Sequence, residues 1–528
     1  MQSDHFDIII IGGGATGAGI ALDASLRGYS VALFERNDFA EGTSSRSTKL
    51  VHGGVRYLEA AVKHLDKKQY DLVKEGLRER KIFLHNAPHL AHPIELVTPL
   101  YRWYELPYIY AGLLLYDLLS GKASLGRSRL LGPKEALRRS PGIDPKGLKG
   151  AVSYFDGAFN DSRMVIALLQ SAEALGAKPC NHHAVESLLE ERGKICGVRI
   201  LERLTGRRRE YGAKIVINAA GPFCDEIRRM ENPDAEPLLV TSRGTHIVLD
   251  RSFLPTEKGL MIPKTADGRL LFALPWEGHC LIGTTDLPSP PTEHPLPAEE
   301  EIEYLIEHAN RYFDIKIEHK DILAAFSGLR PLVKRPGVDS TAKLLREYVT
   351  EFSPGGLLTV TGGKWTSYRA MAEHTVDLAV EALGDSHKNR VCQTADYKVA
   401  GSRGDRRQIV GQLRSAGMEE ACCDYLYRHY GDRSPAILEI AQKEGLKERI
   451  HPGFCALKAE IPYTIRHEYV RRPLDFLARR CNLAMEERTK ALEALPAVTE
   501  LMARELQWSQ TRRSAEESEA REALKRGV

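Results

Sequence analysis

At the start of the chain, apolar runs and turn residues alternate in the order that a strand, a helix and a second strand require. Phe6–Ile11 is apolar and β-branched, which is typical of a buried parallel strand. A helix is expected over Ala15–Arg27, because small and aliphatic residues share one side of it and Gly28 supplies a C-terminal stop. Ser30–Phe34 is predicted to be the second strand.

Two later segments are predicted to return to the same sheet. Ala213–Asn218 is a strand pattern that runs into a glycine turn, and Leu357–Thr361 is another, followed by two glycines and a helix with one apolar face. The long stretches between these returns are rich in short apolar runs and turns. We therefore predict an α/β first domain that is interrupted by a second, α+β domain. The first domain comprises residues 1–91, 151–235 and 325–395, and the second comprises 92–150 and 236–324.

The pattern changes again after about residue 396. Residues 396–528 contain repeated charged, leucine-bearing helices, so an all-helical C-terminal cap is predicted. The last stretch, Arg512 to Val528, is highly charged and is expected to fray.

Composition narrows the class of protein. A chain of 528 residues forms roughly two or three domains, and 43% apolar residues with 27% charged residues is typical of a globular protein. A net charge of only +3 gives no sign of nucleic-acid binding. The nine cysteines contain no CxxC pair, which favours reduced thiols and no metal site.

No apolar run reaches the roughly 18 to 20 residues that a membrane span needs. No secretory signal pattern precedes the first strand either, so any membrane contact is expected to be peripheral.

A glycine-rich loop follows the first predicted strand. Gly12–Gly17 matches G-x-G-x-x-G, a pattern that lets a pyrophosphate approach backbone N–H groups at a helix start. Glu35 closes the second predicted strand, where a carboxylate accepts hydrogen bonds from ribose hydroxyls. The loop predicts dinucleotide binding; the plainer alternative is a glycine turn selected for close helix–sheet packing.

The segment after this loop bears on which dinucleotide is bound. Gly42–Leu58 combines hydroxyl side chains with small residues, which suits a second pass along a phosphate chain and a flat ring. A polar surface loop with Ser and Thr caps would have the same composition, so the segment alone leaves both interpretations open.

Taken together, five motifs resemble those of the FAD-dependent glycerol-3-phosphate dehydrogenases, which belong to the glycine-oxidase and D-amino-acid-oxidase-like flavoproteins. The similarity runs in order from about residue 5 to residue 480, and its most specific pieces are Lys49–Leu58 and Gly362–Arg369. The motifs are Gly12–Gly17, Thr43–Leu58, Asn218–Pro222, Ser327–Pro331 and Gly362–Arg369.

The resemblance implies a Rossmann-type FAD-binding first domain, a discontinuous substrate domain and the helical cap. It also implies oxidation of sn-glycerol 3-phosphate to dihydroxyacetone phosphate by hydride transfer to N5 of a non-covalently held FAD. Electrons would pass to membrane quinone from an enzyme at the cytoplasmic, inner face of the plasma membrane. A homodimer is left open, as are two rival activities: oxidation of an amino or hydroxy acid, and a glycerol-3-phosphate oxidase that uses oxygen.

The resemblance also implies a set of cofactor-binding residues. They are Gly12, Gly14, Gly17, Glu35, Thr43, Ser44, Ser45, Lys49, Leu50, His52, Val185, Gly221, Gly363, Lys364, Trp365 and Thr366.

The expected substrate is a phosphomonoester, for which planar, bidentate guanidinium donors are best suited. The matching family positions are Arg56, Tyr57, Arg330, Arg346 and Lys364, and Arg330 is also expected to assist the chemistry. His246 corresponds to a pocket histidine and is the candidate base, expected at the start of a strand. A structural histidine is the alternative, and for any single arginine so is a salt bridge.

An aromatic and aliphatic block extends from Tyr101 to Leu119, and Lys122, Arg127 and Arg129 follow it. Interfacial segments combine such faces with basic flanks, so this block is the predicted lipid contact. The alternative is a buried amphipathic helix of the second domain. A non-catalytic flavin-binding scaffold is disfavoured by the presence of Arg330 and Lys364.

Overall fold

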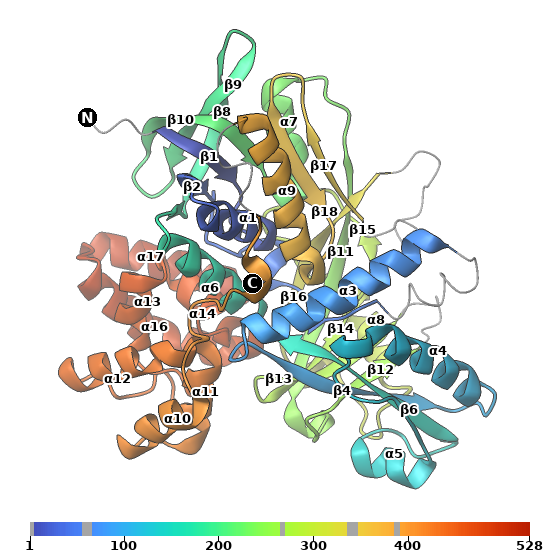
Figure 1. Ribbon diagram of the computed structural model, residues 1–528. Helices are drawn as coiled ribbons and strands as arrows, with labels where there is room; N and C mark the ends of the chain where they lie inside the picture. The colour runs from blue at the N-terminus through green and yellow to red at the C-terminus, as the bar shows by residue number, and fades with distance from the viewer. Residues whose placement is uncertain (1–4, 55–65, 264–269, 335–346, 385–390, 528) are drawn as a thin grey trace.

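The computed structural model describes residues 5–54, 66–263, 270–334, 347–384 and 391–527. Two β-sheets and a helical cap make up this part of the chain (Figure 1). No helix in these ranges is both long and apolar enough to cross a membrane.

The first sheet is the predicted nucleotide-binding sheet. Its central strands are parallel, and β1 (His5–Ile11) lies between β2 (Val31–Phe34) and β10 (Arg207–Asn218). The complete path is β17-β18-β10-β1-β2-β7, with β8 and β9 hairpinned onto β10. The remaining bounds are β7 (Lys178–Cys180), β8 (His183–Glu191), β9 (Lys194–Glu202), β17 (Tyr348–Phe352) and β18 (Leu357–Gly362).

Helix α1 (Ala15–Leu26) packs between α6 (Asp161–Glu173) and α9 (Tyr368–Leu383) on one side of this sheet. Ile8 and Ile10 of β1 are fully buried beneath α1, and the three helices share one hydrophobic core with them. The strand-helix-strand start and both predicted returns, at β10 and β18, are thus present.

The second sheet is mostly antiparallel and runs β15-β11-β14-β13-β12-β4-β6-β3, with β16 on β11 and β5 on β6. The predicted domain limits do not follow this sheet, because β3, nearly all of β6 and most of β16 lie in ranges expected in the first domain. The bounds are β3 (Leu50–Val51), β4 (Ala91–Leu100), β5 (Arg129–Leu131), β6 (Gly150–Phe159), β11 (Leu239–Asp250), β12 (Gly259–Ile262), β13 (Leu271–Trp276), β14 (His279–Gly283), β15 (Leu287–Pro288) and β16 (Ile322–Val333).

Helices cover parts of both sheets and connect them. Helix α3 packs against α4 and against the turn before α9. Helix α4 packs on β6, and α8 packs on β11. The bounds are α3 (Lys67–Asn86), α4 (Glu105–Ser120), α5 (Pro133–Arg139), α7 (Cys224–Glu231) and α8 (Glu299–Ala309).

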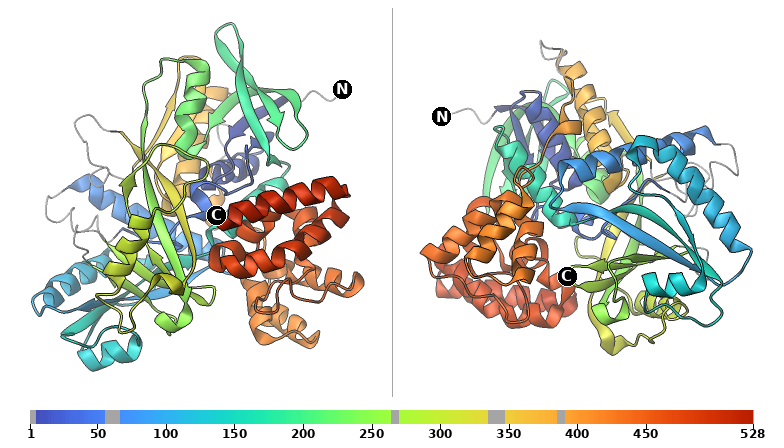
Figure 2. Two further views of the ribbon diagram at one scale, coloured as in Figure 1. Left: turned by 180° about the vertical axis from the view of Figure 1, so that it is seen from behind. Right: turned by 60° about the horizontal axis from the view of Figure 1, so that its bottom comes forward.

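The predicted all-helical cap is confirmed, and it lies beside both sheets (Figures 1 and 2). The expectation that Arg512 to Val528 frays is wrong, because α17 runs from Gln510 to Arg526 and packs on α16 with Ala520 and Leu524 buried. The cap helices are α10 (Arg406–Ser415), α11 (Glu420–Tyr430), α12 (Ser434–Lys443), α13 (Glu460–His467), α14 (Pro473–Arg479), α15 (Leu483–Glu486), α16 (Arg488–Glu505) and α17.

Candidate active site

The glycine loop lies between β1 and α1, and its spacing has a steric cause. A Cβ on Gly17 would lie 1.9 Å from the carbonyl oxygen of Gly12, so no side chain fits where the helix crosses the loop. Gly12 itself has a φ of +110°, and a Cβ there would lie 2.5 Å from the carbonyl oxygen of Ala219. The loop is therefore closed by its own backbone at the start of α1.

Glu35 lies directly beyond this loop. Its carboxylate accepts hydrogen bonds from the N–H of Gly13 at 2.7 Å and from the N–H of Asn37 at 2.9 Å. Burial raises the pKa of Glu35, and the two backbone hydrogen bonds oppose that shift. The side chain is thus fixed at the end of β2, with lone pairs left to accept ribose hydroxyls.

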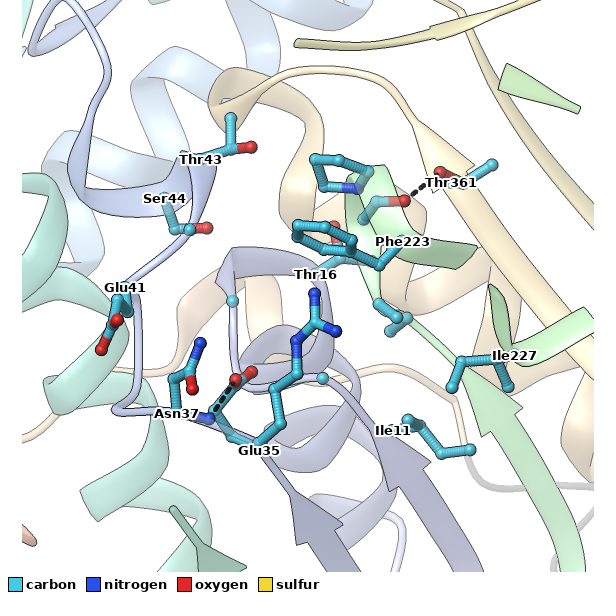
Figure 3. A pocket seen from close by; sticks show the side chains of 18 of the residues that line it. Ile11, Thr16, Glu35, Asn37, Glu41, Thr43, Ser44, Phe223, Ile227 and Thr361 are labelled. Atoms are coloured by element: carbon cyan, nitrogen blue, oxygen red, sulfur yellow. Dashed lines mark hydrogen bonds between the residues drawn. The ribbon is translucent and has the colours of Figure 1, made fainter. Parts of the chain in front are cut away.

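A cavity of about 440 Å³ opens above the glycine loop. Thr43 and Ser44 border one side of it, and Phe223 and Ile227 border the other (Figure 3). Of the predicted cofactor residues, ten line the cavity: Gly12, Gly14, Glu35, Thr43, Ser44, Val185, Gly221, Gly363, Lys364 and Trp365.

Hydrogen bonds link the three motifs around this cavity. The Ser44 hydroxyl accepts from the N–H of Ala15 at 2.9 Å, which places it at the first turn of α1. The Trp365 indole donates to the Ser44 carbonyl at 3.0 Å, and the Thr366 hydroxyl donates to the His52 carbonyl at 3.3 Å. Segments more than 300 residues apart in the sequence are thus held as one wall.

Six predicted cofactor residues do not line the cavity: Gly17, Ser45, Lys49, Leu50, His52 and Thr366. Lys49 is the clearest case, because its ammonium donates to Asp161 at 2.7 Å and to the Ser45 carbonyl at 2.6 Å. Both Lys49 and Asp161 are buried. In the structure this lysine anchors the turn after Thr43 to the start of α6.

His246 lies in the middle of β11, not at the start of a strand as expected. It is 2% exposed and stacks on Phe326, with ring centroids 5.1 Å apart. Its Nε2 is 2.9 Å from the hydroxyl of Thr48, 198 residues away in the sequence, and its buried Nδ1 has no hydrogen-bond partner among the described residues. Burial, with Arg330 and Lys49 nearby, holds the pKa of His246 well below its usual range, so the imidazole is neutral.

Arg330 lies on β16, opposite Ser242 of β11. Its guanidinium donates to the Thr284 hydroxyl and to the Thr285 carbonyl, both at 2.9 Å, and forms an ion pair with Asp286 at 3.4 Å. These contacts fix the plane of a guanidinium that is 16% exposed.

Two glycines leave room for the side chains of Arg330 and His246. A Cβ on Gly244 would lie 2.2 Å from Arg330 Nη2, and a Cβ on Gly283 would lie 2.1 Å from His246 Cδ2. Gly283 is directly opposite His246 in the register of β11 and β14. Residues 244 and 246 share one face of β11, so the guanidinium and the imidazole lie on the same side of the sheet.

Arg56, Tyr57 and Arg346, predicted to bind substrate, lie outside the described residues.

The cap holds the loop that follows Glu35. Asp38, fully buried, accepts from Arg480 at 2.7 and 2.9 Å and from Arg479 at 2.6 Å. These guanidinium groups lower the pKa of Asp38 against the opposing effect of burial. Residues 35–37 and 40–44 line the cavity, so α14 and the residue after it brace one of its walls.

Sequence reasoning missed several polar neighbours. Arg36 lies over the Phe223 ring at 3.8 Å, where it lines the cavity. Thr48 is within the hydroxyl-rich segment but was not singled out, and Thr284 and Asp286 lie in the three-residue connection between β14 and β15. A polar Thr-Thr-Asp run immediately after an apolar strand was the available signal.

Comparison with known proteins agrees with this architecture. A family model described as FAD dependent oxidoreductase matches residues 7–377, and a second, described as the C-terminal domain of alpha-glycerophosphate oxidase, matches residues 392–513. A glycerol-3-phosphate dehydrogenase of Arabidopsis thaliana is 42% identical over 99% of this chain and 86% of its own length. The human mitochondrial glycerol-3-phosphate dehydrogenase is 40% identical over 99% of this chain and 74% of its own.

The chain belongs to the FAD-dependent glycerol-3-phosphate dehydrogenases.

A solved member of this family, from Bacillus halodurans and complexed with FAD, superposes with a TM-score of 0.82 at 30% identity over 100% of this chain and 96% of that one. Glycine oxidase from Bacillus cereus superposes with a TM-score of 0.52 at 19% identity over 72% of this chain and 96% of that one, which shows a shared fold.

The cofactor of the family is FAD, and the cavity fits it. Gly12 and Gly14 put no side chain at the start of α1, where a pyrophosphate can approach, and Glu35 lines the cavity at the end of β2, where a carboxylate can accept ribose hydroxyls.

Proposed function

We propose that this protein oxidises sn-glycerol 3-phosphate to dihydroxyacetone phosphate. The observation that carries the proposal is the pairing of a neutral, buried imidazole with a fixed guanidinium on one face of the second sheet, at His246 and Arg330. Oxidation of a secondary alcohol requires a base for the hydroxyl proton, and a phosphomonoester requires cations. The relatives that span the whole chain are named for this substrate.

His246 serves as the base in this proposal. A neutral imidazole accepts a proton, and the low pKa keeps it neutral through the physiological range. The hydrogen bond with Thr48 holds the ring plane, and stacking on Phe326 prevents the ring from tilting. When bound, FAD supplies the hydride acceptor at N5.

Arg330 orients the phosphate or the developing carbonyl, and Arg56, Tyr57 and Arg346 complete the anion site in the proposal. Lys364 lines the cofactor cavity at the start of the turn before α9. Its charge and the adjoining backbone N–H groups suit the electron-rich edge of a reduced flavin.

We propose membrane quinone as the electron acceptor, reached by peripheral contact through α4. One face of α4 is buried through Leu113 and Tyr116, so the helix also packs within the second domain, as the alternative interpretation expects. The other face is apolar and exposed, with Leu118 at 76%, and Trp103 in the turn just before the helix is 74% exposed. Lys122, Arg127 and Arg129 beside it are exposed as well, a combination typical of interfacial helices.

Steady-state turnover with an artificial dye tests the substrate. Activity with sn-glycerol 3-phosphate, and none with glycerol, lactate or D-alanine, is the expected result. Activity confined to an amino or hydroxy acid would overturn the proposal. Oxygen consumption that matches dye reduction would replace quinone by oxygen and leave the substrate intact.

Sedimentation with phosphatidylglycerol vesicles tests the membrane contact. Trp103→Ser with Leu118→Ser should release the protein from the vesicles, whereas Leu175→Ser, a matched change at an exposed leucine elsewhere, should not. Equal binding by all three proteins would exclude α4 as the contact.

A further inference from the structure

Two cysteines of the cap lie in contact although they are 33 residues apart in the sequence. The Sγ atoms of Cys422 and Cys455 are 2.8 Å apart, and both residues are free thiols. Cys422 is in the first turn of α11 and is 3% exposed, whereas Cys455 is partly exposed. A disulfide needs an S–S distance of about 2.05 Å, so a sub-ångström movement would join them.

The local fold sets this contact. Residues 448–458 form a short hairpin, in which Ile450 donates its N–H to the Ala456 carbonyl at 2.9 Å and Lys458 donates to the Glu448 carbonyl at 2.8 Å. The hairpin places Cys455 on its returning arm, against the start of α11. The contact therefore rests on two backbone elements with their own hydrogen bonds.

The charges around Cys422 favour a thiolate. Arg449, on the outgoing arm of the hairpin, lies beside the thiol and forms an ion pair with Glu419 at 2.5 Å. The hydrogen bond with Cys455, with help from Arg449, lowers the pKa of Cys422 to about 7, while burial and Glu419 oppose the shift. The same hydrogen bond raises the pKa of Cys455.

The other cysteines lack this environment. Burial raises the pKa of Cys280 and Cys481, and it raises the pKa of Cys180 to about 11. Cys423, next to Cys422 in the chain, donates to the Met418 carbonyl at 3.7 Å, and burial raises its pKa too.

We propose that Cys422 and Cys455 form a hydroperoxide-reactive pair, in which Cys422 is the attacking thiol and Cys455 the resolving thiol. The Cys422 thiolate attacks one peroxide oxygen, the O–O bond breaks, and the leaving hydroxide takes up the proton that the thiol released on ionising, so with hydrogen peroxide the products are a Cys422 sulfenic acid and water. Cys455 then attacks the Cys422 sulfur, the S–O bond breaks, and a second water leaves with the disulfide. Two thiols are oxidised and one peroxide is reduced to two waters.

The linkage itself is tested on the full-length flavoprotein with hydrogen peroxide, followed by proteolysis without reduction and mass spectrometry. A Cys422–Cys455 cross-linked peptide is expected, and dithiothreitol should abolish it. Cys423→Ser is the matched control and should retain the cross-link. Absence of the peptide, or a link through Cys423 in place of Cys455, would overturn the proposal.

Single variants separate the two roles. In Cys455→Ser, dimedone should label Cys422 after peroxide treatment, because the sulfenic acid has no resolving thiol. In Cys422→Ser, Cys455 should remain unlabelled, because burial still raises the pKa of its thiol after the Cys422 thiol is gone. If Cys455 is labelled in Cys422→Ser and Cys422 is not labelled in Cys455→Ser, the attacking and resolving roles are reversed. Equal labelling in the two variants would rule out separate roles.

Arg449 is a positioning residue in this proposal, and a pH profile distinguishes its role from a structural one. The oxidation rate of the wild type should rise with a midpoint near pH 7, where Cys422 ionises. Arg449→Gln should move the midpoint to higher pH, and Arg449→Lys should restore it. An unchanged midpoint in Arg449→Gln would remove Arg449 from the account.

Discussion

The cofactor cavity and the substrate side of the molecule are built in different ways. At the cavity, the turn Gly12–Gly17 supplies glycines and backbone groups that are adjacent in the sequence, and further lining residues come from other segments. On the substrate side, side chains supply the contacts, and they come from segments far apart in the sequence, as with Thr48 and His246. Substitutions on the first side should therefore remove the cofactor, whereas those on the second should leave it bound and impair the chemistry.

The largest effect is expected from Gly17→Ala. The new Cβ would lie 1.9 Å from the Gly12 carbonyl oxygen, which is backbone and has no room to move. The loop should open and the purified protein should be colourless, without flavin absorbance. Gly411→Ala is the matched control, because a Cβ there meets nothing within 4 Å, and it should stay yellow. A yellow Gly17→Ala protein with normal turnover would contradict the steric account.

His246→Ala should come next. Loss of a general base typically lowers the rate by about 10²- to 10⁴-fold, and here kcat should fall in that range while FAD content is unchanged. Absorbance of the holoprotein and steady-state kinetics check both halves of the prediction. Near-normal kcat would make His246 a structural residue.

The cofactor cavity and the substrate side also differ in how much of each can be predicted from the sequence. The glycine loop, Glu35 and the first parallel strands could be predicted because hydrophobic periodicity and glycine spacing are local signals. The contact of His246 with Thr48, and the place of Arg330 above Gly244, depend on strand register between β11, β14 and β16, which no local pattern contains. For the same reason the ion pair between the buried Lys49 and Asp161 of α6 could not be predicted from the sequence.

Gly283→Ala tests whether strand register positions the base. Its Cβ would lie 2.1 Å from His246 Cδ2, so the ring must shift. A displacement of about 1 Å can cost about 100-fold, so kcat should fall by that order with KM and FAD content little changed. Wild-type kcat in this variant would show that the ring position is not critical.

Arg330→Lys is expected to have a smaller effect. The lysine keeps the charge but loses the planar fork, so KM for sn-glycerol 3-phosphate should rise about tenfold with a modest change in kcat. A KM equal to that of the wild type would place the phosphate elsewhere.

The smallest effect is expected in the pH dependence of kcat/KM for Arg330→Gln. The Arg330 cation helps to lower the pKa of His246, so its removal should raise that pKa. The acid limb of the kcat/KM profile should therefore move to higher pH in Arg330→Gln and remain in place in Arg330→Lys. A shift of the acid limb to lower pH in Arg330→Gln would contradict the claim that the Arg330 cation lowers the pKa of His246.

The most direct test of the central claim is anaerobic mixing of the purified yellow protein with sn-glycerol 3-phosphate, followed by flavin absorbance. Rapid bleaching of the oxidised flavin band, absent with glycerol and with a hydroxy acid, is the predicted result. A protein that stays yellow with sn-glycerol 3-phosphate but bleaches with an amino or hydroxy acid would keep the fold and contradict the function.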